Sequence, residues 1–131
     1  MTMIVLDTNV LVSAFWSAQG PPRQILKAVL NRELLPCHDY RIMREYAAVL
    51  RRPKFNFPDF AVAELLAEIG KSGLSVVAPA STDPLPDESD RPFYDVARCC
   101  RAMLITGNLK HYPRASFIVS PTDFLLEWEQ K

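Results

Sequence analysis

Acidic side chains at three separate places in the chain could share one metal ion. Asp7 directly follows the apolar run Met3–Leu6. Glu45 lies inside a helical pattern, and Asp90 ends a short acidic stretch that begins at Asp87. Three carboxylates brought together repel each other, and an oxygen-seeking divalent cation such as Mg²⁺ or Mn²⁺ relieves that repulsion. A cation held in this way would polarise a phosphodiester and lower the pKa of a bound water.

Each of these acids also has an ordinary structural explanation. Asp7 could cap the helix that follows it, and Glu45 could form exposed ion pairs with the arginines on its own helix. Asp87, Glu88 and Asp90 precede a helix, where backbone N–H groups favour negative charge. For Asp7 or Glu45 taken alone the structural explanation is the commoner one, so a metal site requires a fold that brings the acids together.

Short apolar runs alternate with longer helical patterns along the chain. Apolar runs predict strands at Met3–Leu6, Leu34–Cys37, Leu74–Ala78, Met103–Thr106 and Phe117–Val119. Apolar residues at helical spacing predict helices over Asn9–Ser17, Gln24–Asn31, Asp39–Leu50, Pro58–Lys71, Val96–Ala102 and Pro121–Trp128. Asp39 is a candidate N-cap, Phe60 is expected to point inward, and Pro79–Pro92 is expected to be a loop.

This alternation predicts an α/β fold built from βαβ units, with a mostly parallel sheet of four to five short strands and helices on both faces. Ligands of such sheets bind outside the carboxyl ends of the strands. Asp7 and the turn Thr106-Gly107-Asn108 both follow predicted strands. The two segments are therefore expected to lie at the same edge of the sheet.

The size and composition of the chain limit the classes of protein that it can belong to. The length of 131 residues, with 49% hydrophobic residues, predicts a single domain over residues 1–131 and excludes a disordered chain. No apolar run approaches the ~20 residues of a membrane span, and the N-terminus lacks the features of a signal peptide. The three cysteines form no disulfide framework, so a reducing, cytoplasmic location is expected. The formal net charge of zero argues against holding nucleic acid by bulk electrostatics, but not against cutting it.

Other enzyme chemistries find little support in the sequence. His38 and His111 are the two histidines, and their context lacks the spacing of a zinc site. No serine has a nucleophile motif, and Cys99-Cys100 lie in an apolar helical pattern where structural thiols are usual. The four glycines form no phosphate-binding loop.

Five segments, spread across nearly the whole chain, match one family in order. They are I-V-L-D-T-N-V-L-V-S-A (Ile4–Ala14), E-Y-A-A-V-L-R-R-P-K-F (Glu45–Phe55), D-E-S-D-R-P-F-Y-D-V-A (Asp87–Ala97), L-I-T-G-N-L-K-H-Y-P (Leu104–Pro113) and I-V-S-P-T-D-F-L (Ile118–Leu125). Together they resemble the PIN-domain family, metal-dependent ribonucleases that are common as VapC-like toxins of prokaryotic toxin–antitoxin pairs. The resemblance implies a three-layer α/β/α domain.

The same resemblance assigns roles to individual residues. It implies that Asp7, Glu45 and Asp90 bind Mg²⁺ or Mn²⁺ and are catalytic together with Asn108. Many members of the family have a fourth Asp where this chain has Asn108, which leaves the number of metal ions open. Asn9 and Thr106 resemble positions that support the metal ligands or the substrate, although ordinary turn hydrogen bonds would explain them equally well.

Two further acids and four basic residues complete the expected site. Asp87 is a possible compensation for the missing fourth Asp. Asp95, one turn after Asp90, is expected to be solvated or to support the site. Basic residues at the rim would hold the phosphates that flank the cleaved bond, although solvated helix charges are the commoner explanation for any one of them. The candidates are Arg41, Arg44, Lys110 and Arg114.

The function implied by the resemblance is that of a metal-dependent endoribonuclease, the toxin of a toxin–antitoxin pair. RNA would be its substrate, and a cognate antitoxin protein and a second copy in a homodimer would be its partners. Three alternatives stay open: a PIN-like nuclease of RNA or DNA processing, an inactive PIN-like binding module in which Asn108 marks the loss of activity, and a small α/β interaction protein whose acids are caps.

Overall fold

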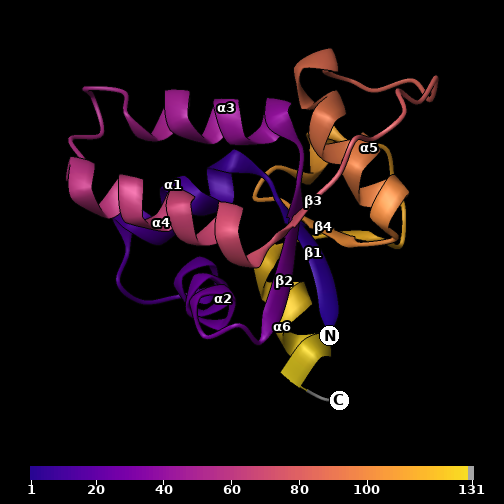
Figure 1. Cartoon of the computed structure of the whole chain (residues 1–131). Coiled ribbons are helices and arrows are strands. Elements are labelled where there is room, and N and C mark those ends of the chain that lie inside the picture. Colours follow the sequence, from indigo (N-terminus) through magenta and orange to yellow (C-terminus); the bar gives the residue numbers. More distant parts are fainter. Residues whose placement is uncertain (130–131) are drawn as a thin grey trace.

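A five-stranded, all-parallel sheet forms the centre of the fold in the computed structural model, which describes residues 1–129 (Figure 1). The strand order is β3-β2-β1-β4-β5. The strands are β1 (Thr2–Leu6), β2 (Leu34–His38), β3 (Leu74–Ser75), β4 (Met103–Ile105) and β5 (Ile118–Val119). The α/β fold with a parallel sheet is thereby confirmed. The last two residues of the predicted domain, 130 and 131, lie outside the described residues.

Helices cover both faces of this sheet. The α-helices are α1 (Thr8–Trp16), α2 (Pro21–Leu30), α3 (Tyr40–Leu50), α4 (Asp59–Ser72), α5 (Arg91–Cys100) and α6 (Pro121–Glu129), and two 3₁₀ turns are η1 (Glu88–Asp90) and η2 (Leu109–His111). In Figure 1, α5 packs on one side of the sheet against β1, β2 and β4, while α1 to α4 lie on the other side. No helix within residues 1–129 combines the length and the apolar character that crossing a membrane requires.

The central strand β1 explains why the strands of this chain are continuous apolar runs. β1 pairs with β2 on one side and with β4 on the other, so Ile4 lies opposite both Pro36 and Met103. Ile4, Val5 and Leu6 are all fully buried, because helices cover both faces of a parallel sheet. Asp7 follows these residues at the carboxyl end of the strand.

Three local expectations from the sequence were wrong. α5 begins at Arg91 and not at Val96, because Pro92 lies in its first turn, where a missing N–H costs nothing. β3 ends at Ser75, short of the predicted Ala78. Phe60 is 75% exposed and does not point inward, because the buried stripe of α4 runs through other positions of the helix. Those positions are Val62, Leu65 and Ile69.

Two contacts hold α3 over the carboxyl end of β1. The Tyr46 hydroxyl donates a hydrogen bond to the Leu6 carbonyl oxygen, and the Tyr46 ring packs against Phe93 of α5. Asp39 caps α3 as predicted, its carboxylate accepting the Ile42 N–H at 3.0 Å. α3 therefore lies with Glu45, the residue before Tyr46, at the edge of the sheet where Asp7 emerges.

Candidate active site

The carboxylate of Asp7 is buried and does not cap α1. Asp7 is 5% exposed, and its side chain makes no capping hydrogen bond although its backbone occupies the N-cap position. Three donors converge on Oδ2: the Thr106 hydroxyl at 2.9 Å, the Tyr112 hydroxyl at 2.9 Å and the Asn9 amide at 3.3 Å. No side chain within residues 1–129 donates a hydrogen bond to Oδ1.

Burial raises the pKa of Asp7, even though the hydrogen bonds from Thr106 and Tyr112 act in the opposite direction. An ionised carboxylate in such a place costs free energy unless a positive charge lies nearby. Burial also raises the pKa of Tyr112, so its hydroxyl stays protonated and remains a donor to Asp7.

Glu45 is held beside Asp7 by the first residue of α1. The Thr8 hydroxyl donates a hydrogen bond to Glu45 Oε2. Glu45 forms no ion pair with any Lys or Arg of the described residues. The explanation as an exposed helix ion pair therefore does not apply to this residue, and its partner is instead the segment that follows β1.

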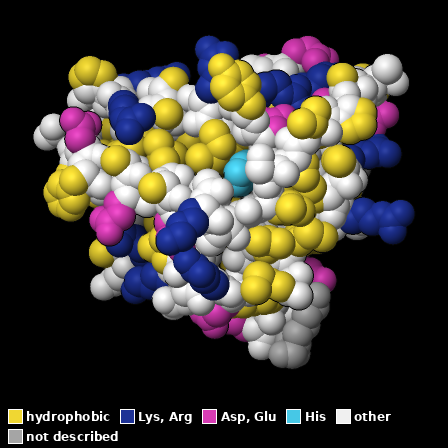
Figure 2. All heavy atoms as spheres, viewed as in Figure 1, with side chains coloured by type: hydrophobic (Ala, Val, Ile, Leu, Met, Phe, Trp, Pro, Cys, Tyr) yellow, Lys and Arg dark blue, Asp and Glu magenta, His cyan; other side chains and the backbone are white. Residues whose placement is uncertain are grey.

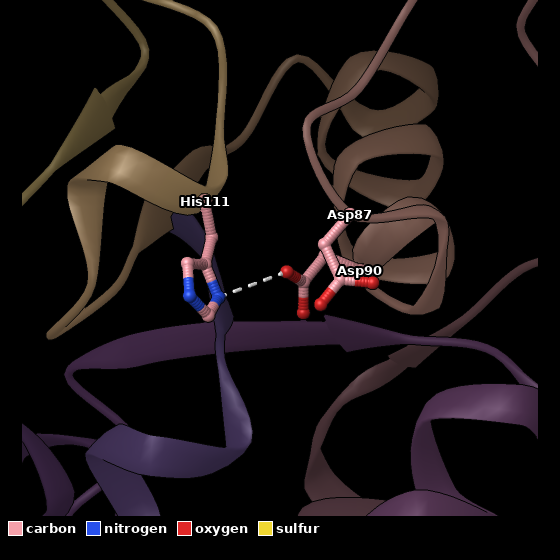
Figure 3. A group of neighbouring side chains, drawn as sticks. All are labelled: Asp87, Asp90 and His111. Carbon is pink, nitrogen blue, oxygen red and sulfur yellow. Dashed lines mark ion pairs between the residues drawn. The ribbon is translucent and has the colours of Figure 1, made fainter.

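The third group of acids lies opposite, where η1 leads into α5, and a histidine faces it. Figure 3 shows the imidazole of His111 directed toward the carboxylates of Asp87 and Asp90. One possible ligand atom from each of the three residues lies within 4.8 Å of the other two. His111 Nδ1 is 3.4 Å from Asp90 Oδ2. Asp7 and Glu45 lie outside this compact group.

Asp90 is the most perturbed acid of the site. Its Oδ2 is buried and has no hydrogen-bond partner among residues 1–129. Burial and then repulsion from Asp7 and Asp87 raise the pKa of Asp90 to about 6, and Glu45 adds to this repulsion. Asp90 is therefore near enough to three other carboxylates for their charges to disfavour its ionisation.

Asp87 also has a structural role, as the N-cap of η1. Its Oδ1 accepts hydrogen bonds from the Ser89 N–H at 3.0 Å and from the Ser89 hydroxyl at 2.8 Å, as expected for a capping acid. These bonds hold the pKa of Asp87 below its usual value.

Asn108 contacts the same imidazole as Asp90. Its side-chain amide lies 2.9 Å from His111 Nε2, and its backbone N–H donates to the Thr106 hydroxyl at 3.0 Å. The Thr106 hydroxyl in turn donates to Asp7, so one hydrogen-bonded chain links the turn after β4 to the end of β1.

The sequence analysis missed His111 and Tyr112 as site residues. Their nearness to the turn at Asn108 was the signal that could have revealed them.

Three comparisons with known proteins bear on this site and fold. Residues 3–110 match the sequence model of the PIN domain. This chain belongs to the PIN-domain family. It is 24% identical over 108 residues to the uncharacterized protein MJ1680 of Methanocaldococcus jannaschii, a match that covers 80% of this chain and 70% of that protein. The fold resembles the crystal structure of PAE2754 from Pyrobaculum aerophilum, with a TM-score of 0.60 and 15% identity over 100% of this chain and 91% of that one.

The residues of this PIN domain fit a divalent cation. Asp90 offers a buried oxygen that accepts no hydrogen bond within residues 1–129, and the Asp87, Asp90 and His111 ligand atoms lie close enough to share one ion. Oxygen ligands suit Mg²⁺ and Mn²⁺, and an imidazole suits transition metals. The site is therefore compatible with a metal ion, and PIN domains are typically nucleases.

The structure separates the four expected rim residues of the PIN domain into two pairs. Arg41 forms an ion pair with Asp39 at 2.8 Å, and Arg44 lies over the Tyr40 ring at 5.3 Å. Lys110 and Arg114 instead line a hollow of about 490 Å³ beyond the turn after β4.

The expectation that Asp95 is solvated was wrong. Asp95 is 2% exposed, and its Oδ1 accepts the Ser81 N–H at 3.2 Å. Its place on the inner face of α5 turns the carboxylate toward the loop before η1, so Asp95 anchors that loop.

Proposed function

We propose that this PIN domain is a metal-dependent endoribonuclease and the VapC-like toxin of a toxin–antitoxin pair. The observation that carries the proposal is the surroundings of Asp90. Its Oδ2 is buried and accepts no hydrogen bond within residues 1–129, and burial, followed by repulsion from Asp7 and Asp87, raises the pKa of Asp90 to about 6. Such an arrangement is costly in the protein alone and becomes favourable when a cation neutralises it.

The residues divide between holding the cation and positioning the substrate. Asp7, Glu45 and Asp90 would hold it directly or through water, with Asp87 and His111 beside them. A bound divalent cation supplies an activated water and neutralises the charge that builds up on the phosphate. Asn108 would orient the attacking water or the scissile phosphate through its amide, which lies beside His111.

Asn9 and Thr106 would keep Asp7 in place. Both donate to its Oδ2, which supports a role in turning Oδ1 toward the cation. Oriented ligands of this kind bind metal more tightly, since their rotation is already restricted.

Mn²⁺ is the cation we favour over Mg²⁺. Mg²⁺ prefers oxygen ligands and retains its waters, whereas Mn²⁺ also accepts imidazole. The Nδ1 atom of His111, 3.4 Å from Asp90, supports this choice.

Two partners complete the proposal. A cognate antitoxin would inhibit the enzyme by occupying the crevice around the carboxylates, and a second copy of the chain would form a homodimer. Both follow only from the resemblance to VapC-like toxins.

The test is cleavage of a mixed, structured RNA by the purified protein with Mn²⁺, with Mg²⁺ and with EDTA. Asp7→Asn is the site variant, and Asp123→Asn, an exposed acid on α6, is its matched control. We expect cleavage that requires metal, disappears in Asp7→Asn and persists in Asp123→Asn. Absence of cleavage together with absence of metal binding in calorimetry would overturn the proposal in favour of an inactive binding module.

Two additional measurements separate the toxin from a processing nuclease. Induced expression of the wild-type chain should arrest bacterial growth, and Asp7→Asn should not. A single-stranded DNA of the same sequence should remain intact. Cleavage of that DNA without growth arrest would instead assign the domain to nucleic-acid processing.

A further inference from the structure

Four aromatic side chains form a stack at the ends of α1 and α3 that lie away from the carboxylates. Phe55 and Phe57, from the loop between α3 and α4, stack with ring centroids 5.2 Å apart, and Phe15 stacks on Phe57 at 4.9 Å. Trp16, the last residue of α1, meets the edges of Phe55 and Phe57 at 5.2 and 6.0 Å. Trp16 is nevertheless 66% exposed. Its neighbours hold the indole in position without covering it.

The same loop carries three cations. Arg51, Arg52 and Lys54 are exposed, and none of them forms an ion pair with a carboxylate of residues 1–129. Lys54 Nζ lies 5.1 Å from the centre of the Phe55 ring. No acid occurs between Arg51 and Pro58. Figure 2 shows hydrophobic, basic and acidic side chains together near the left edge, where α3 leads into α4. We call residues 51–57 together with Trp16 the basic aromatic patch.

The two helices that carry the patch also carry the site. α1 packs against α3, where Thr8 donates a hydrogen bond to Glu45, and at its other end against the loop after α3, where Phe15 stacks on Phe57. Thr8 and Phe15 both lie in α1 and are seven residues apart. Seven residues are about two helical turns, so these two residues share one side of α1 at a separation of roughly 10 Å. That distance corresponds to about three stacked nucleotides.

We propose that the basic aromatic patch binds single-stranded RNA about three nucleotides from the bond that is cleaved. One base would stack on the exposed face of Trp16, while Arg51, Arg52 and Lys54 would contact the neighbouring phosphates. Surfaces that bind single strands combine stacking aromatic rings with cations along the backbone, and both features occur here together. The inference rests on the proposed function for the position of the cleaved bond, but the binding itself does not require cleavage.

Fluorescence of Trp16 tests the stacking directly. Trp128→Phe leaves Trp16 as the one tryptophan, and Trp16→Phe leaves Trp128 as the matched control. Each variant is titrated in EDTA with a twelve-nucleotide oligouridylate, so that the RNA stays intact. We expect quenching of Trp16 but not of Trp128, and no quenching by an RNA duplex of the same length. Absence of Trp16 quenching, or equal quenching by the duplex, would overturn the inference.

The cations are tested by a pair of charge-matched double variants. Arg51→Gln/Lys54→Gln removes two charges from the patch, and Lys27→Gln/Lys71→Gln removes two exposed charges from α2 and α4. The logarithm of the RNA-binding constant falls linearly with the logarithm of the salt concentration. In the patch variant this slope should be smaller in magnitude by about 0.7 for each lost phosphate contact. The control should leave it unchanged. An equal loss in both double variants would contradict a local binding site.

The oligonucleotide experiment tests the basic aromatic patch and the cleavage experiment tests the proposed function, so either proposal can be overturned without the other. Trp16→Ala should weaken oligouridylate binding by about fivefold to a hundredfold. In the active enzyme it should raise KM with little change in kcat, because it removes contacts remote from the reaction. Binding through the patch without cleavage in any metal would overturn the proposed function alone. Cleavage with a KM that Trp16→Ala does not change would overturn this inference alone. A protein partner would then be the alternative occupant of the patch.

Discussion

Replacing Asp90 by Asn should stabilise the metal-free protein at pH 7.5, although it removes a residue of the proposed site. The pKa of Asp90 is raised from 3.8 to about 6, first by burial and then by repulsion from neighbouring carboxylates. At 1.36 kcal/mol per pKa unit, ionising Asp90 in the native protein costs about 3 kcal/mol relative to the unfolded chain. The amide avoids this charge but must itself be buried, so we expect a net gain of about 1–2 kcal/mol.

The sign of the pH dependence follows from the raised pKa. The native state holds the Asp90 proton more tightly than the unfolded chain, so the penalty is absent well below pH 3.8 and complete above about pH 6. At pH 5 it is about half as large as at pH 7.5. The advantage of Asp90→Asn should therefore shrink as the pH falls.

Thermal unfolding in EDTA measures this difference. A gain of 1–2 kcal/mol corresponds to a Tm about 4–7 °C higher for a chain of this length. Adding Mn²⁺ at a hundred times its Kd should stabilise the wild type by about 2.7 kcal/mol, and the variant by much less, so the order of the two Tm values reverses. Glu127→Gln, an exposed acid on α6, should leave Tm unchanged. An Asp90→Asn protein that is less stable than the wild type in EDTA, or equally changed at pH 5 and 7.5, would refute the reasoning.

Four further substitutions test the surroundings of the site and the packing of the fold. Tyr112→Phe removes a hydrogen-bond donor from buried Asp7, so the free energy of unfolding in urea should fall by about 1.5–3 kcal/mol. The Mn²⁺ affinity should fall about tenfold, and an unchanged affinity would show that Tyr112 does not position Asp7 for the metal ion. His111→Gln should weaken Mn²⁺ binding more than Mg²⁺ binding in calorimetry, because imidazole is a poor ligand for Mg²⁺; equal losses would place His111 outside the coordination sphere. Gly73→Ala would bring a Cβ within 2.5 Å of two carbonyl oxygens and should cost about 1–3 kcal/mol or more in urea. Gly70→Ala, whose Cβ would meet no atom closer than 3.9 Å, should instead stabilise α4 by about 0.5–1 kcal/mol.

Local patterns were enough to predict the parallel α/β architecture. A strand buried on both faces must be apolar throughout, and a helix on such a sheet must have one apolar side, so both elements are visible within short windows. The Asp39 cap of α3 was predictable for the same reason, because cap and helix are neighbours in sequence. The start of α5 was not predictable in this way, because proline is common both in loops and in the first turn of a helix, where Pro92 lies. The outward direction of Phe60 depended on the exact phase of α4.

The sequence by itself determined that Asp7 follows a buried strand, and the order of motifs pointed to Glu45 and Asp90 as its companions. Only the tertiary structure decided what these acids contact. Tyr112 reaches Asp7 across 105 residues of chain and Thr106 reaches it across 99, both because β4 pairs beside β1. His111 was passed over because its significance depends on the turn after β4 placing it against Asp90. Hydrogen bonds between distant side chains, and the burial that shifts a pKa, depend on how the elements pack, and no local pattern encodes that packing.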